Sequence, residues 1–225
     1  LCTGSHDFNS VAFDIFEKKW GYRYVCKSFQ DKYGLVSSTD IGVNVLYTFN
    51  RRICADITLV NGEGNKTEEK DSVFRAGTGI SFTLQEGFLI RGYYDRMKKG
   101  IVNQQGYALL VSYNRERYNL KAEYNYQQNH NLVAGHHYGG ISFNGTLSLR
   151  NNLKLYARYD RLESVRVLDD VNRWNYVNDG ALFIAGIEYS PAQSIRISPN
   201  FQGWQPAQRH LPFLSKVYLS LELKI

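Results

Sequence analysis

The sequence predicts an all-β protein: an up-and-down antiparallel β-barrel that spans a membrane. Three observations lead to this fold class. Apolar and polar residues alternate almost everywhere from about residue 38 to the end, which is the period of a strand with one apolar face. Several of these stretches are long enough for the tilted span of about 9–11 residues that a membrane strand needs. The connections between them alternate between short and long, as in outer-membrane barrels.

Residues 1–35 do not alternate, and we expect them to form a leading segment ahead of strands at 36–225. Phe16, Trp20 and Tyr24 recur at the spacing i, i+4, i+8, which predicts a short helix. The rest of the segment is predicted to be a long loop that folds into or over the barrel. The first residues lack the charged and apolar regions of a signal peptide. The chain is therefore expected to be mature or to begin partway through a longer protein.

About eleven strands are predicted to follow, each with an apolar and uncharged set of alternate residues on one face. These sets run from Ile41 to Phe49, Ile53 to Leu59, Phe74 to Phe82, Phe88 to Tyr94, Tyr107 to Tyr113, Tyr118 to Tyr126, Ile141 to Leu147, Leu153 to Tyr159, Ala181 to Tyr189, Ile195 to Phe201 and Val217 to Ile225. A Lys or Arg facing the middle of a bilayer costs about 2–4 kcal/mol. The lack of charge on these faces therefore predicts contact with lipid. A soluble sandwich, the alternative, favours shorter strands of about 5–6 residues.

The predicted connections fall into two classes. The short ones lie at 50–52, 85–87, 114–117, 150–152 and 190–193, and the long ones at 61–72, 96–105, 128–136, 162–179 and 203–215. Short turns face the periplasm and long loops face outward in outer-membrane barrels. Because bacterial single-chain barrels have an even number of strands, an odd count means either that the leading segment supplies a strand or that N-terminal strands are missing from this chain, and the second explanation is favoured.

Composition removes several other classes of protein. Mean hydropathy is -0.40, and no run of about 18 apolar residues predicts a membrane helix. The formal net charge of +6 is spread over turns and loops, so nucleic-acid binding is not expected. Cys2, Cys26 and Cys54 have no metal-like spacing. Isolated thiols are favoured over a disulfide between Cys2 and Cys26.

If the apolar set faces lipid, the complementary face of each strand lines the interior. Its charged residues comprise seven basic and seven acidic side chains, so the interior is nearly neutral. The candidates for pore-lining residues are Arg75, Arg91, Asp95, Lys121, Glu123, Arg158, Asp160, Glu188 and Arg196. Two interpretations stay open. The arginines form a charged constriction that selects solutes, or they pair with neighbouring carboxylates as structural struts.

Two other clusters contain side chains that can ligate metals. His130, His136 and His137 occur in one predicted loop, and Asp169-Asp170 occurs in another. The histidines have no carboxylate or thiol at close spacing, and a solvated acidic loop explains the aspartates better. The sequence therefore predicts no metal site and no cofactor. It predicts no catalytic residue either, because no nucleophile is expected within reach of a histidine at the barrel rim.

Several stretches together resemble a known family. They are 17–24 (EKKWGYRY) with 27–31, then 61–64 (NGEG), 174–176 (WNY), 195–204 (IRISPNFQGW) and the last strand. The chain resembles the porin-like outer-membrane proteins of Bacteroidetes, which are related to the phosphate-selective porins. The resemblance spans nearly the whole chain and implies that it is the C-terminal part of a longer barrel. It also implies a bacterial outer-membrane location and a homo-oligomer such as a trimer.

The expected function is passive diffusion of small hydrophilic solutes, including anions, through a water-filled channel. The expected partners are outer-membrane lipid and those solutes, with no nucleic acid. The alternative is a non-conducting barrel that acts as an accessory or docking subunit of a larger assembly.

Overall fold

The structure, a computed structural model, describes residues 11–36, 40, 42–62, 73–85, 87–167, 171–208 and 210–224, with the backbone alone at 11–14. Cys2, the acidic pair Asp169-Asp170, and the end residues Ile41 and Ile225 of two predicted apolar sets lie outside the described residues. Cys26 and Cys54 are free thiols.

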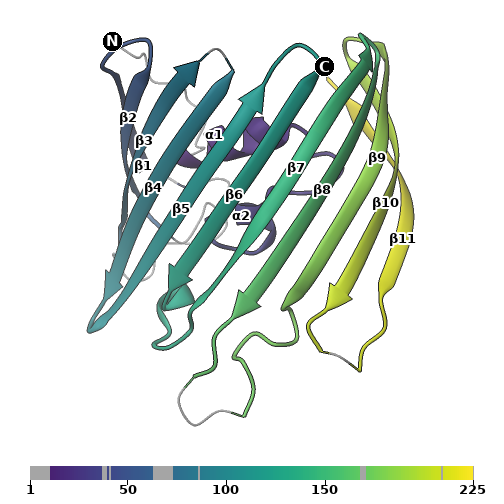
Figure 1. Cartoon of the computed structure of the whole chain (residues 1–225). Helices are drawn as coiled ribbons and strands as arrows, with labels where there is room; N and C mark the ends of the chain where they lie inside the picture. The colour runs from purple at the N-terminus through teal and green to yellow at the C-terminus, as the bar shows by residue number, and fades with distance from the viewer. Residues whose placement is uncertain are drawn as a thin grey trace.

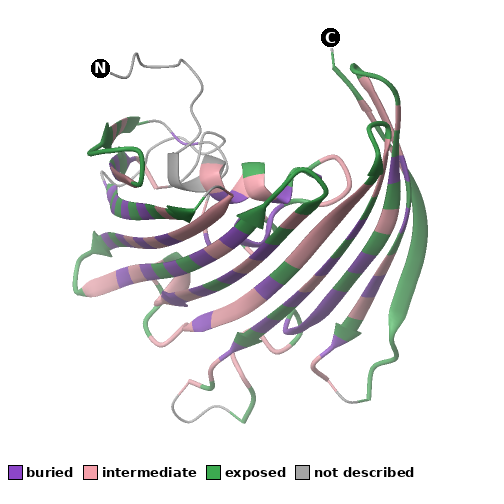
Figure 2. Cartoon of the chain, turned by 45° about the horizontal axis from the view of Figure 1, so that its top comes forward, coloured by how far each residue is buried: buried purple, intermediate pink, exposed green. Residues whose placement is uncertain are grey.

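The described chain forms one sheet of eleven antiparallel strands in sequence order, which confirms the predicted fold class and strand count. The strands are β1 (Gly42–Thr48), β2 (Ile53–Val60), β3 (Arg75–Gln85), β4 (Phe88–Lys99), β5 (Val102–Asn114), β6 (Tyr118–Gln128), β7 (Tyr138–Arg150), β8 (Leu153–Ser164), β9 (Gly180–Ala192), β10 (Ile195–Pro206) and β11 (Leu214–Leu223). The tilted strands curve into an open trough (Figures 1 and 2). The sheet is not closed, because β1 pairs only with β2 and β11 pairs only with β10.

The two faces of the sheet have opposite chemistry. The predicted apolar sets lie on the convex face, where Val45 is 58% and Leu109 48% exposed. Their neighbours along each strand point to the concave face and are mostly buried, so exposed and buried bands alternate along strands such as β3, β8 and β9 (Figure 2). Ala181 departs from this pattern: it is 3% exposed, between its pairing partners Arg161 and Gln205.

The hairpin between β4 and β5 differs from the prediction. A long connection was expected at 96–105, but the two strands pair continuously as far as Lys99 and Val102. Only Gly100 and Ile101 join them, and Gly100 has a φ of +58°. Such a two-residue turn requires the left-handed backbone that glycine adopts without strain. The polar residues that suggested a loop instead extend both strands.

The leading segment folds against the concave face. It contains α1 (Val11–Trp20) and the short α2 (Phe29–Lys32), which lie behind β5 to β8 in Figure 1. Lys18 and Lys19 occupy the last turn of α1, where positive charge favours the helix dipole. Gly21, with a φ of +73°, follows the end of this helix. Among the described residues, no helix is long and apolar enough to cross a membrane.

Three apolar clusters fix the segment to the sheet. Phe16 packs with Tyr93, Ala108 and Leu110. Trp20 and Tyr22 pack with residues of β8 and β9, namely Tyr156, Leu182 and Ile184. Phe29 and Leu35 pack with Tyr138 and Leu162. Each cluster combines large side chains of the segment with inward-facing residues of the strands, so apolar burial holds the segment in place.

Candidate functional site

Paired charges line the concave face of the sheet. Six basic side chains each form an ion pair with a carboxylate: Arg75–Asp95 at 2.8 Å, Arg91–Asp56 at 2.6 Å, Lys121–Glu123 at 3.1 Å, Lys154–Glu188 at 3.0 Å, Arg158–Asp160 at 2.6 Å and Arg196–Glu222 at 3.2 Å. Two of these pairs join residues i and i+2 of one strand, which share a face. Three others join neighbouring strands, and Arg91 of β4 reaches across β3 to Asp56 of β2.

The Arg91–Asp56 pair is the most deeply buried of the six. Two guanidinium nitrogens donate to the two Asp56 carboxylate oxygens at 2.6 and 3.0 Å, and one of them also donates to Ser81 Oγ at 3.0 Å. Both charged side chains are 0% exposed. A Cβ at Gly79 would lie 2.2 Å from an Arg91 nitrogen. The absence of a side chain at Gly79 therefore leaves room for the guanidinium.

The same wall residues also bind the leading segment. Lys121 Nζ donates to the Phe16 carbonyl at 3.0 Å, Arg158 to the Lys27 carbonyl at 2.7 Å, and Arg75 to the Leu35 carbonyl at 2.8 Å. The Tyr24 hydroxyl donates to Glu188 at 3.0 Å. The Lys27 and Leu35 carbonyls lie outside regular helix and gain partners in this way, whereas the Phe16 carbonyl belongs to α1. No sequence pattern predicts these bonds, because every residue has the same backbone carbonyl.

All nine residues predicted to line a pore lie on the concave face. Eight are buried, from Arg91 at 0% to Arg75 at 6% exposure. Arg196 alone is half-buried. Pairing of these arginines with neighbouring carboxylates is one of the two interpretations that the sequence allowed. Contact of these nine residues with a solute stays a prediction.

The exposed charges of this region belong to the leading segment. Residues 15–36 contain five basic and two acidic residues. Lys18, Arg23, Lys27 and Lys32 are exposed, whereas the Asp31 side chain is only 9% exposed and lies against Arg23 at 2.8 Å and Lys27 at 3.2 Å. The sequence analysis did not predict this cationic surface, because it placed the charged constriction among the inward-facing residues of the strands.

The predicted histidine cluster forms an aromatic group around Trp174. The His136 ring stacks on Trp174 at 4.4 Å, and the His130 ring lies 5.7 Å from it. Burial lowers the pKa of His130 to about 4, with smaller contributions from Arg75 and His136. Within the described residues, no three His, Cys, Asp or Glu side chains are grouped as metal ligands.

Comparison with known proteins adds information about the fold. No family model and no curated protein matches the sequence. The outer membrane channel DcaP of Acinetobacter baumannii is similar in structure, with a TM-score of 0.62 and 12% identity over 81% of this chain and 61% of that chain. A porin refined at 1.8 Å is similar with a TM-score of 0.59 and 10% identity over 85% of this chain and 64% of that chain.

The chain has the fold of these porins. It spans less than two thirds of the length of either one. At this level of identity the likeness describes the path of the backbone, and the chemistry of the concave face must be argued from this chain's own residues.

Proposed function

We propose that the chain forms part of a bacterial outer-membrane porin, through which small hydrophilic solutes diffuse. The observation that carries this proposal is the opposite chemistry of the two faces. The convex face is apolar and uncharged through the middle of the eleven strands and carries charges near strand ends, as at Arg96, Lys98, Arg161 and Glu163, while the paired charges of the strand interiors lie on the concave face. Such a sheet suits an environment with lipid against its convex face and water against its concave face. The similarity to DcaP and to a porin supports the same fold.

The leading segment sets the width of the proposed channel. It is anchored to the wall at Phe16, Trp20 and Phe29 and by the hydrogen bonds from Lys121, Arg158 and Arg75. The segment thus forms a fixed constriction in the proposed channel. The ion pairs beneath it make the concave face of the sheet nearly neutral.

The same segment gives the channel a preference for anions. Its solvent-facing side chains are Lys18, Arg23, Lys27 and Lys32, and the Asp31 carboxylate lies mostly buried beside Arg23 and Lys27. A net positive surface at a constriction raises the local concentration of anions. The six neutral wall pairs do not oppose this field.

Conductance in a planar bilayer tests the proposed function directly. The purified full-length protein should give ohmic, long-lived conductance steps. Absence of conductance from protein that is folded and inserted would overturn the proposal.

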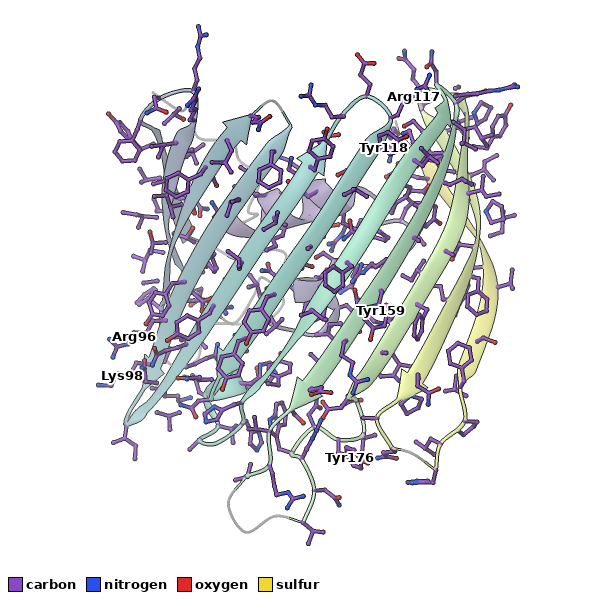
Figure 3. All side chains as sticks on the ribbon, viewed as in Figure 1. Arg96, Lys98, Arg117, Tyr118, Tyr159 and Tyr176 are labelled. Atoms are coloured by element: carbon purple, nitrogen blue, oxygen red, sulfur yellow. The ribbon has the colours of Figure 1, made fainter. Side chains whose placement is uncertain are left out.

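The reversal potential in a KCl gradient tests the anion preference. Lys27→Gln combined with Lys32→Gln should move it toward the potassium equilibrium value. Lys98→Gln is the matched control, because Lys98 is exposed on β4, away from the segment (Figure 3). An equal shift in the control would mean that general surface charge, not the segment, sets the selectivity.

A second function is favoured by the coverage of the concave face. Ion pairs of the wall are buried beneath the segment, as expected for a plugged barrel that serves as an accessory or docking subunit. A folded, inserted and electrically silent protein is the result that this alternative predicts. Assembly as a homotrimer belongs to the proposed porin and is tested by the mass of the detergent-solubilised complex.

A further inference from the structure

We infer that a pocket at the long-loop end of the concave face binds a sugar ring. The pocket has a volume of about 520 Å³ and lies between α2, the connections before β7 and β9, and β10. This inference rests on the proposed function, because it makes the pocket a solute subsite at the mouth of the channel. Its volume is within the range of roughly 300–1,000 Å³ that is common for small-molecule sites.

Large rings held by other contacts form much of the pocket wall. Trp174, Trp204, Tyr33 and Tyr138 all line it. Trp174 Nε1 donates to the His137 carbonyl at 2.7 Å, and the Tyr138 hydroxyl donates to the Tyr33 carbonyl at 2.6 Å. Such contacts fix the rings before a ligand arrives, which reduces the entropy lost on binding. A pyranose ring has apolar C–H faces that match aromatic planes.

The polar groups of the pocket suit hydroxyls. Asn131, Asn175 and Asn178 line it, and each amide offers both donors and an acceptor, as a sugar hydroxyl does. No carboxylate is among the lining residues, and Lys32 is the one lining side chain with a full charge. The Tyr33 hydroxyl is buried without a hydrogen-bond partner among the described residues. These features fit an uncharged or acidic saccharide and disfavour a cation.

Tryptophan fluorescence provides the test. The chain has three tryptophans, and two of them line the pocket. The purified full-length protein in detergent should show a saturable change in emission with maltose, N-acetylglucosamine or glucuronate. Sorbitol is the control probe, because it has hydroxyls without a ring and should give no saturable change.

Variants separate this pocket from the rest of the loop. Trp174→Leu should weaken binding of the responding sugar about fivefold to tenfold, the scale of one aromatic contact. Asn178→Ala should weaken it about threefold to tenfold, and Asn178 is exposed, so this change leaves folding intact. Tyr176→Leu is the matched control, since Tyr176 lies in the same connection but does not line the pocket (Figure 3).

The fluorescence titration does not depend on conduction, so the two proposals fail separately. An electrically silent protein that binds a sugar overturns the channel and supports the pocket. A conducting protein with no saturable response to any of the three sugars overturns the pocket. An equal response to sorbitol, or an equal loss in Tyr176→Leu and Asn178→Ala, also overturns it.

Discussion

At the scale of single residues, the concave face is built from charges that neutralise one another. Removing a carboxylate or a guanidinium from water is costly, and only a close partner offsets the cost. Arg91 and Asp56 meet this condition with two hydrogen bonds between fully buried side chains. Such pairs fix the register of the wall more than they attract a solute.

Loss of the Arg91 charge should therefore destabilise the protein strongly. Arg91→Met leaves Asp56 buried without a partner and should lower the free energy of unfolding by about 3–5 kcal/mol. Adding Asp56→Leu should recover much of that loss. Arg161→Met is the control, because the Arg161–Glu163 pair is 44% and 46% exposed and should cost less than about 1 kcal/mol. Equilibrium unfolding in guanidinium measures all three; equal losses for Arg91→Met and Arg161→Met would contradict the role of burial.

His130 should make the connection before β7 sensitive to acid. Burial lowers its pKa to about 4, whereas an unfolded histidine titrates near 6.5. Between these values the open loop binds a proton that the folded loop does not, so folding of the loop weakens as the pH falls from about 6.5 to 4. Protease cleavage within 129–137 should increase over this range. His130→Phe should remove most of that dependence, and His210→Phe, at an exposed position, should leave it unchanged.

At the scale of elements, the leading segment depends on the sheet for its structure. A helix of ten residues such as α1 is marginal in water by itself. It is stabilised here by Phe16 and Trp20 in the apolar clusters. The Trp20 ring also lies 4.8 Å from the Arg158 guanidinium, and its Nε1 donates to the Cys26 carbonyl at 2.7 Å.

Truncation of Trp20 should release the segment. Trp20→Ala should weaken its docking by about 3–5 kcal/mol, which increases both single-channel conductance and protease cleavage between residues 11 and 36. Tyr118→Ala is the control, because Tyr118 is a half-exposed aromatic residue of β6 near the short-turn end (Figure 3). If conductance stays at the level of the unmodified protein while the segment becomes cleavable, the segment does not form the constriction.

At the scale of the whole molecule, the environment of the convex face decides between a membrane protein and a soluble one. Leu109 lies near the middle of β5 and is 48% exposed. In water, a charge at such a position is nearly neutral for stability. In lipid, the same charge near the bilayer midplane costs about 2–4 kcal/mol. The open backbone edges of β1 and β11 would also need partners in lipid.

Leu109→Arg exploits this difference. We expect it to lower stability in lipid bilayers by about 2–4 kcal/mol. Ile101→Arg should have little effect, because Ile101 is 100% exposed at the tip of the β4–β5 hairpin. Unfolding in guanidinium, measured in bilayers, gives both values. Two small and equal effects would contradict lipid contact at Leu109.

The sequence by itself determined the sheet and its two faces. Period-2 alternation is a local property, so the outward position of Val45 or Leu109 and the inward position of Arg91 could be read without coordinates. The neutrality of the inward face also followed from its equal numbers of basic and acidic residues, and the spacing of Lys121 and Glu123 on one strand pointed to pairing. The β4–β5 hairpin was misplaced, since polar residues at a strand end resemble a loop.

Only the tertiary structure decided what covers that inward face. The leading segment was expected to fold into or over the barrel, but alternation says nothing about a segment that does not alternate, so its contacts through Phe16, Trp20 and Phe29 could not be predicted. The hydrogen bonds from wall side chains to segment carbonyls have no sequence signature, because every residue has the same backbone. The pocket around Trp174 brings together four segments that are distant in the chain. Long-range packing alone sets those positions.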